Sequence, residues 1–157
     1  MSESGRSGTR RFVVDTNVFV AAIKPFSKSG HGGASTSTSS LVLLLMLIND
    51  DELELFANRW LLDEYKRLGE ELSSETSELI LGQLTAKMEA TELEEKAVAR
   101  CRPYLPDGED ADVMHAATCL QSRAVLITND RDFDRIKESG VIEVWSISEA
   151  IRKLSTQ

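Results

Sequence analysis

The stretch "RRFVVDTNVFVAAI" at residues 10–23 decides the fold, because an apolar run ends there on three short polar side chains. Residues 12–14 are continuously apolar, which is typical of a buried strand in a parallel sheet. Asp15, Thr16 and Asn17 follow directly, and apolar residues then resume. Two interpretations fit this pattern: the polar residues form a turn and cap a helix, or they begin a metal site at the strand end.

The composition describes an ordinary globular protein with an acidic balance. Of the 157 residues, 41% are hydrophobic and 28% are charged, and the formal net charge is -8. This charge argues against a protein that holds nucleic acid by bulk positive charge. It remains compatible with an acidic site that binds phosphates through a divalent cation.

The ends and the longest apolar run give expectations about organisation and location. We expect a flexible N-terminal segment at 1–10 and a single domain at 11–157. The N-terminal segment lacks the apolar stretch of a signal peptide, and the longest apolar run, 41–48, is too short to cross a membrane. We therefore expect a cytoplasmic protein in which Cys101 and Cys119 are reduced, although a bridge between them is possible.

Helical and strand-like patterns alternate along the chain. Short apolar runs predict strands at 11–15, 52–57, 124–128 and 141–145. Helical spacing and capping residues predict helices at 16–24, 35–50, 58–72, 107–124 and 146–154, and one or two further helices within 73–102. This alternation indicates an α/β fold with a parallel sheet and helices on both faces.

Four acids would meet at one edge of such a sheet, because parallel strands end on the same side. Asp15 and Asp130 follow strands, whereas Glu64 and Asp112 lie early in the helices that start at that edge. Two carboxylates about 4 Å apart repel by roughly 4 kcal/mol at an effective dielectric near 20. A bound cation would offset this repulsion, and Mg²⁺ prefers such oxygen ligands. The alternative for Asp112 or its neighbour Asp110 is that it only caps a helix.

Four segments resemble, in order, the acidic motifs of the PIN-domain family, and within it the VapC-like toxins of toxin–antitoxin pairs. These segments are "VVDTNVFV", "LLDEYKRL", "DADVMHAAT" and "LITNDRDF". The resemblance implies a three-layer α/β/α sandwich around a parallel sheet of four or five strands. It also implies an endoribonuclease dependent on Mg²⁺ or Mn²⁺ that hydrolyses the phosphodiester bonds of single-stranded or structured RNA.

The resemblance assigns roles to individual residues. Asp15, Glu64, Asp112 and Asp130 match the acids that bind metal and carry catalysis. Five further residues match or accompany the polar positions beside them: Thr16, Asn17, Thr128, Asn129 and Asp132. The third motif also contains Glu109 and Asp110, so either of them remains an alternative metal ligand.

The resemblance also implies partners and leaves an alternative function open. It suggests a cognate antitoxin and, together with the excess of apolar residues at 41–48, a homodimer. The alternative is a PIN-like RNA-binding or scaffold module without catalysis, which the presence of all four acids disfavours. Phosphotransfer domains also place Asp at strand ends, but "DTN" lacks the second acid that those domains need there.

Overall fold

The computed structural model describes residues 10–23 and 34–156. Apart from Arg10, the predicted N-terminal segment therefore lies outside the described residues. The strands are β1 (Arg11–Val14), β2 (Glu54–Ala57), β3 (Met88–Ala90), β4 (Val125–Ile127) and β5 (Val144–Trp145). They form one parallel sheet in the order β3-β2-β1-β4-β5. The predicted α/β fold with a parallel sheet is confirmed.

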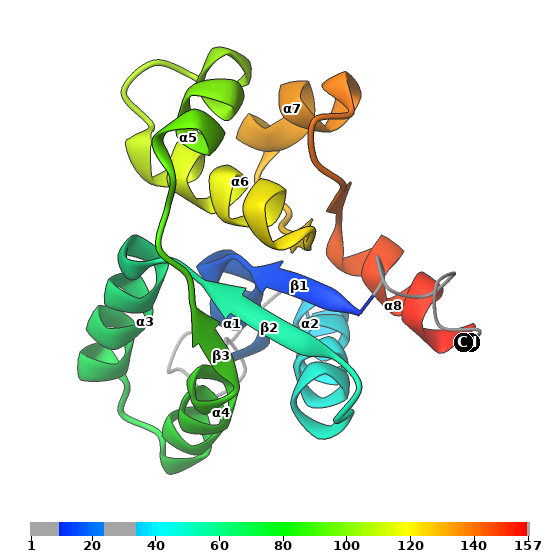
Figure 1. Cartoon of the computed structure of the whole chain (residues 1–157). Helices are drawn as coiled ribbons and strands as arrows, with labels where there is room; N and C mark the ends of the chain where they lie inside the picture. Colours follow the sequence, from blue (N-terminus) through cyan, green and yellow to red (C-terminus); the bar gives the residue numbers. More distant parts are fainter. Residues whose placement is uncertain (1–9, 24–33, 157) are drawn as a thin grey trace.

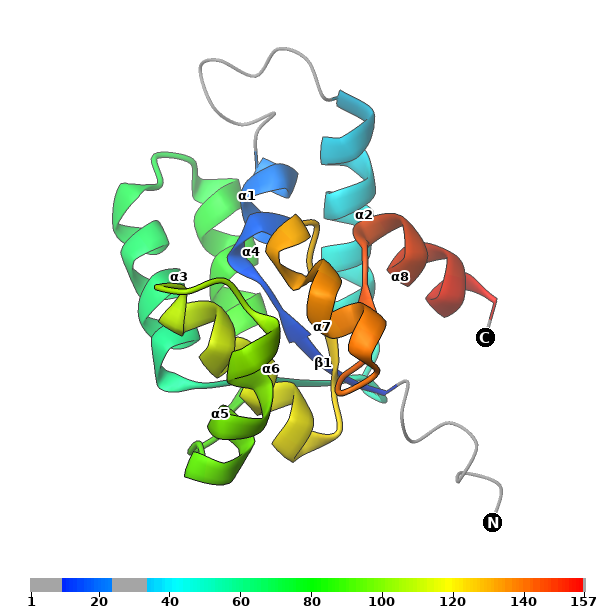
Figure 2. The same cartoon turned by 90° about the horizontal axis from the view of Figure 1, so that it is seen from above.

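Helices cover both faces of this sheet (Figure 1). The helices of one layer are α1 (Thr16–Ile23), α2 (Ala34–Asn49), α3 (Arg59–Glu71) and α4 (Glu75–Ala86), with α8 (Ile147–Ser155) packed against α2. The other layer contains α5 (Glu95–Cys101), α6 (Asp110–Ser122) and α7 (Asp134–Ser139), which lie over the sheet in the view from above (Figure 2). Two short 3₁₀ helices, η4 (Arg102–Tyr104) and η5 (Arg131–Phe133), precede α6 and α7.

The expectation of helices alone between residues 73 and 102 is wrong, because β3 lies between α4 and α5. Met88, Glu89 and Ala90 are not strongly strand-forming, and they are largely exposed, so they show no buried apolar pattern. Backbone pairing with β2 forms this strand: Leu55 is in register with Met88, and the Thr91 amide donates to the Ala57 carbonyl at 2.8 Å. A partner in the sheet, rather than local propensity, therefore decides this segment.

The core lies around β1, the central strand. Phe12, Val13 and Val14 are fully buried, and the Phe12 ring packs against Trp145 with ring centroids 5.6 Å apart. From α3, the buried Tyr65 hydroxyl donates to the Val14 carbonyl at 2.7 Å. These contacts fix the position of the residue that follows Val14, which is Asp15.

Local capping explains where several helices begin. Asn58 caps α3 and Ser74 caps α4, each through a side-chain oxygen that accepts a backbone amide. Ser146 and Glu149 form a reciprocal capping box at the start of α8, where the sequence predicts a helix. The α3 helix thus begins immediately after β2, which brings its first turns to the carboxyl edge of the sheet.

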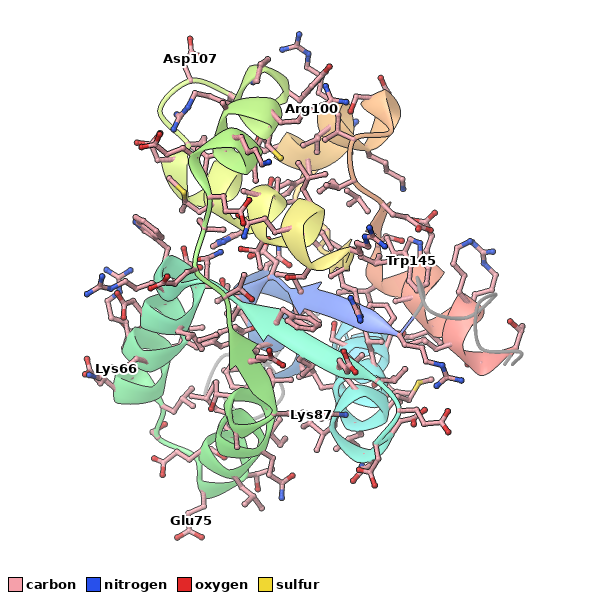
Figure 3. All side chains as sticks on the ribbon, viewed as in Figure 1. Lys66, Glu75, Lys87, Arg100, Asp107 and Trp145 are labelled. Carbon is pink, nitrogen blue, oxygen red and sulfur yellow. The ribbon has the colours of Figure 1, made fainter. Side chains whose placement is uncertain are left out.

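Charged side chains lie on the outside of both helical layers. Figure 3 shows Lys66 and Glu75 pointing outward from α3 and α4, and Asp107 pointing outward before α6. Cys101 and Cys119 are buried and free. None of the helices in the described part of the chain has the length and apolar character that a bilayer crossing needs.

Candidate active site

The four predicted acids come together at the carboxyl edge of the sheet. Asp15 follows β1, Glu64 lies in the second turn of α3, Asp112 lies in the first turn of α6, and Asp130 precedes η5. Electrostatic effects link the four: Glu64 and Asp130 both act on Asp15, and Asp130 and Asp15 both act on Asp112. The structure therefore places near one another acids that lie up to 115 positions apart in the sequence.

Asp15 is held by a polar network that joins β1 to β4. Its Oδ2 accepts from the Thr128 hydroxyl at 2.8 Å and from the Asn17 Nδ2 at 3.3 Å. Asn17 Nδ2 also donates to Thr128 Oγ1 at 3.2 Å, and the Asp130 amide donates to the same hydroxyl oxygen at 3.0 Å. Thr128 therefore connects the first and fourth acids.

Burial destabilises the charged form of Asp15. The residue is only 8% exposed, and this burial raises the pKa of its carboxyl, while the hydrogen bond from Thr128 lowers it. The nearby Tyr65 hydroxyl is also affected: burial raises the pKa of Tyr65 well above its usual value, and Asp15 and Glu64 add to that shift. Both shifts have the direction expected for a buried site with excess negative charge.

Asp112 is the acid whose environment is most unfavourable for a carboxylate. Burial, with repulsion from Asp130 and smaller contributions from Asp15 and Glu109, raises the pKa of Asp112 to about 7. Its Oδ2 atom is buried and has no hydrogen-bond partner among the described residues. An unpaired buried acceptor is costly unless another group occupies the space beside it. A cation at this position would meet that need.

Neither Asp112 nor Asp110 is the N-cap of α6. The residue that caps α6 is Glu109, whereas Asp112 lies within the first turn. Asp130 caps η5, because its Oδ1 accepts from the Asp132 amide at 2.9 Å. Asp130 thus has a local structural role and also lies close enough to Asp112 to raise the pKa of that carboxyl.

Ligand atoms gather in two groups within this region. Asp15, Glu64 and His115 each offer one atom within 4.8 Å of the others, and Glu109, Asp112 and Asp132 do the same. Asp110 and Asp130 are in neither group, and the Asp110 carboxylate pairs with Arg102 at 3.0 Å. Of the two alternatives in the third motif, Glu109 is therefore better placed than Asp110 to approach a cation.

Some side chains near the acids have other partners. Asn129 Oδ1 accepts from the Ile147 amide at 3.0 Å, so this side chain holds the start of α8. Thr16 is the first residue of α1 and is half-buried. Sequence reasoning missed Asn58, which links α3 to α6 by donating to His115 Nδ1 at 3.1 Å. Its only signal in the sequence was a capping residue after a strand.

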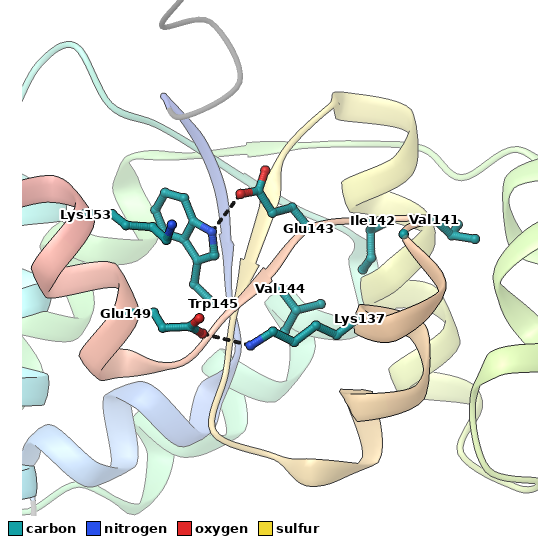
Figure 4. A pocket seen from close by; sticks show the side chains of 9 residues that line it. Lys137, Val141, Ile142, Glu143, Val144, Trp145, Glu149 and Lys153 are labelled. Atoms are coloured by element: carbon teal, nitrogen blue, oxygen red, sulfur yellow. Dashed lines mark hydrogen bonds and ion pairs between the residues drawn. The ribbon is translucent and has the colours of Figure 1, made fainter.

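A separate hollow lies along β5 (Figure 4). It has a volume of about 590 Å³ and its lining includes none of the four acids. Lys137 pairs with Glu149 at 2.9 Å, and Lys153 lies over the Trp145 ring at 5.4 Å. These charges already have partners, so the hollow shows no free group that points to a ligand.

The model of the PIN domain family matches residues 12–139, which is most of the chain. No curated protein matches the sequence.

Solved structures of low sequence identity share the fold. One is a chain of VapBC2 from Rickettsia felis, whose structure was solved with a DNA fragment from the VapBC2 promoter. Its sequence is 18% identical, its TM-score is 0.55, and the match covers 87% of this chain and 98% of that chain. A chain of VapBC-1 from nontypeable Haemophilus influenzae is 17% identical with a TM-score of 0.57, and the match covers 88% of this chain and 98% of that chain. A chain of FitAcB from Neisseria gonorrhoeae is 17% identical with a TM-score of 0.55, and the match covers 87% of this chain and 98% of that chain.

Proposed function

The chain belongs to the PIN domain family, and we propose that it is a ribonuclease that requires Mg²⁺ or Mn²⁺. The observation that carries this proposal is the buried Oδ2 atom of Asp112, which has no hydrogen-bond partner in the described part of the chain and lies near three other acids. A divalent cation fits this donor set, since carboxylate oxygens are the ligands that Mg²⁺ and Mn²⁺ prefer. We propose Asp15, Glu64, Asp112 and Asp130 as the residues that hold it.

The protein's own residues have distinct tasks in this proposal. Thr128 and Asn17 orient the Asp15 carboxylate through their hydrogen bonds to its Oδ2. Asp130 is oriented by its bond from the Asp132 amide, which engages one of its two carboxylate oxygens. When bound, the cation lowers the pKa of an attacking water and offsets charge on the phosphodiester. Burial of Asp15 and Asp112 keeps this chemistry in a partly water-excluded place.

The test is cleavage of single-stranded and structured RNA by purified protein. We expect cleavage with Mg²⁺ or Mn²⁺ and none in excess EDTA. The matched variants are neighbours on α3: Glu64→Gln should abolish cleavage, whereas Asp63→Asn should not, because Asp63 is exposed and outside the cluster. Full cleavage in EDTA, or equal cleavage by both variants, would contradict the mechanism. RNA binding without cleavage would favour the non-catalytic scaffold.

We also propose that this nuclease is the toxin of a toxin–antitoxin pair and acts on RNA in the cytoplasm. The similarity of its fold to chains of VapBC and FitAcB complexes supports a cognate partner protein. Expression of the chain in bacteria should arrest growth, and co-expression of the neighbouring small reading frame should relieve the arrest. Growth arrest that the Glu64→Gln variant also causes would argue against a role for the nuclease.

A further inference from the structure

The buried side chain of Asn58 has three hydrogen-bonding positions in use. Its Oδ1 accepts from the Leu61 amide at 2.8 Å, which caps α3. Its Nδ2 lies 2.9 Å from Thr118 Oγ1 and 3.1 Å from His115 Nδ1, both on α6. Asn58 is fully buried, so water does not compete for these positions.

Two neighbours determine which way the Asn58 amide points. The Leu61 amide can only donate, so the atom that faces it must be the carbonyl oxygen. The Thr118 hydroxyl gives its proton to the Met114 carbonyl at 2.8 Å, so it must accept from Asn58. Both constraints place the NH₂ group of Asn58 toward α6.

This orientation determines the tautomer of His115. Because Asn58 Nδ2 can only donate, His115 Nδ1 must accept and therefore carries no proton. The neutral ring then has its proton on Nε2, which lies 3.6 Å from Glu64 Oε1. This distance is longer than a hydrogen bond, but such contacts in ligand-free sites often tighten when the site is filled.

We propose that His115 is a positioning residue for Glu64: Asn58 holds its proton on Nε2, and this N–H directs the Glu64 carboxylate into the metal site. The inference rests on the proposed metal site. It gives Glu64, which lies on α3, a partner on the opposite face of the sheet. The side chain of His115 is 2% exposed and that of Glu64 is 28% exposed, so the pair is shielded on the histidine side.

The same geometry keeps His115 out of the metal's coordination, although its ring lies among ligand atoms. To bind a cation, Nε2 would have to lose its proton. The neutral ring would then carry a proton on Nδ1, directed at the NH₂ group of Asn58. Two donors would face each other in a buried place, which is costly. Histidine here therefore orients a ligand, as neighbouring groups commonly do at metal sites.

Nitrogen NMR of ¹⁵N-histidine-labelled protein tests the tautomer directly. The chain has two histidines, so His115→Asn identifies the signals of this ring. We expect a protonated Nε2 and an unprotonated Nδ1, both without metal and with saturating Mg²⁺. Asn58→Asp keeps the oxygen that caps α3 but removes the donor toward α6, so it should put a proton on Nδ1. A proton on Nδ1 in the wild type would overturn the proposal.

Two matched variants separate positioning from packing. In His115→Gln the side-chain amide can lie near the place of Nε2 and donate to Glu64, whereas in His115→Asn it lies near Nδ1 and can only satisfy Asn58. Calorimetry with Mg²⁺ should show binding about tenfold to a hundredfold weaker in the Asn variant and nearly unchanged in the Gln variant. The opposite order, or equal losses, would mean that His115 only fills space and satisfies Asn58. These readouts need no RNA, so they stand apart from a failure to detect cleavage.

Discussion

Replacing Asp112 with Asn should stabilise the metal-free protein at neutral and alkaline pH. The folded-state pKa of Asp112 is about 7, raised from 3.8 by burial and then by Asp130. A raised carboxyl pKa means that the unfolded chain releases this proton more readily than the folded chain. Ionised Asp112 therefore lowers the free energy of unfolding. This loss of stability is absent below about pH 4, grows as pH rises toward 7, and is complete above that value. Asn carries no charge at any of these pH values, so it avoids the penalty.

The size of the effect follows from the same shift. Moving the pKa from 3.8 to about 7 corresponds to roughly 4 kcal/mol at 1.36 kcal/mol per pH unit, as an upper bound. Asp112 is half-buried rather than enclosed, so solvent screening reduces this to about 2 kcal/mol. The carboxylate also lies in the first turn of α6, where its loss costs about 0.3–1 kcal/mol. The expected net gain is about 1–2 kcal/mol, or several degrees in melting temperature.

Thermal unfolding of both proteins in EDTA between pH 5 and 8.5 measures this gain. The difference between variant and wild type should increase with pH and level off above about pH 7. Mg²⁺ at ten times its Kd should then stabilise the wild type by about 1.4 kcal/mol, and the variant should lose most of this shift.

The control for this experiment is Asp110→Asn. Asp110 lies two residues away, is exposed and pairs with Arg102, so its replacement should give no gain that depends on pH and should keep the Mg²⁺ shift. An Asp112→Asn variant that is less stable than wild type at pH 8 in EDTA would refute the reasoning. It would show that the carboxylate makes a favourable contact within the folded chain.

Three further outcomes are expected. Asp130→Asn keeps an oxygen to accept from the Asp132 amide, so stability in EDTA should hold or rise by up to about 1 kcal/mol. Calorimetry of this variant should show that the Mg²⁺ response is lost. Early melting together with a full metal response would show that Asp130 has a purely structural role. Leu45→Glu should convert the expected homodimer to a monomer in light scattering, because Leu45 is 41% exposed on α2. A wild-type protein that is monomeric at high micromolar concentration would contradict the homodimer. Tyr65→Phe should cost about 1–3 kcal/mol in denaturant unfolding, because it leaves the Val14 carbonyl unpaired, and no loss would show that this carbonyl finds another partner.

Several features of the fold could be predicted because they depend on local patterns. The apolar run before Asp15 is buried in the central strand, and the capping residues at Ser146 and Glu149 begin a helix where the sequence indicates. The strand β3 could not be predicted, because its three residues have neither strand propensity nor a buried face. Its conformation depends on hydrogen bonds to β2, which lies more than 30 residues earlier.

The convergence of the four acids was also within reach of the sequence. In a parallel sheet, a residue that follows a strand lies at the same edge as residues that follow the other strands. Asp15 and Asp130 are placed by this rule alone, whatever the details of packing. The rule gives no orientation for a side chain, so it could not separate Glu109 from Asp110. In the structure Glu109 lies near Asp112, whereas Asp110 pairs with Arg102.

The sequence by itself thus determined the alternation of helices with four of the five strands of the described sheet and the edge at which the acids gather, because these follow from hydrophobic periodicity and chain connectivity. Only the tertiary structure decided the electrostatic state of Asp112 and the proton position on His115. The raised pKa of Asp112 depends on its burial and on Asp130, which lies 18 positions later, and the tautomer depends on Asn58, which lies 57 positions before His115. Both are set by low local polarity and the direction of a few hydrogen bonds, and neither quantity exists until the chain is folded.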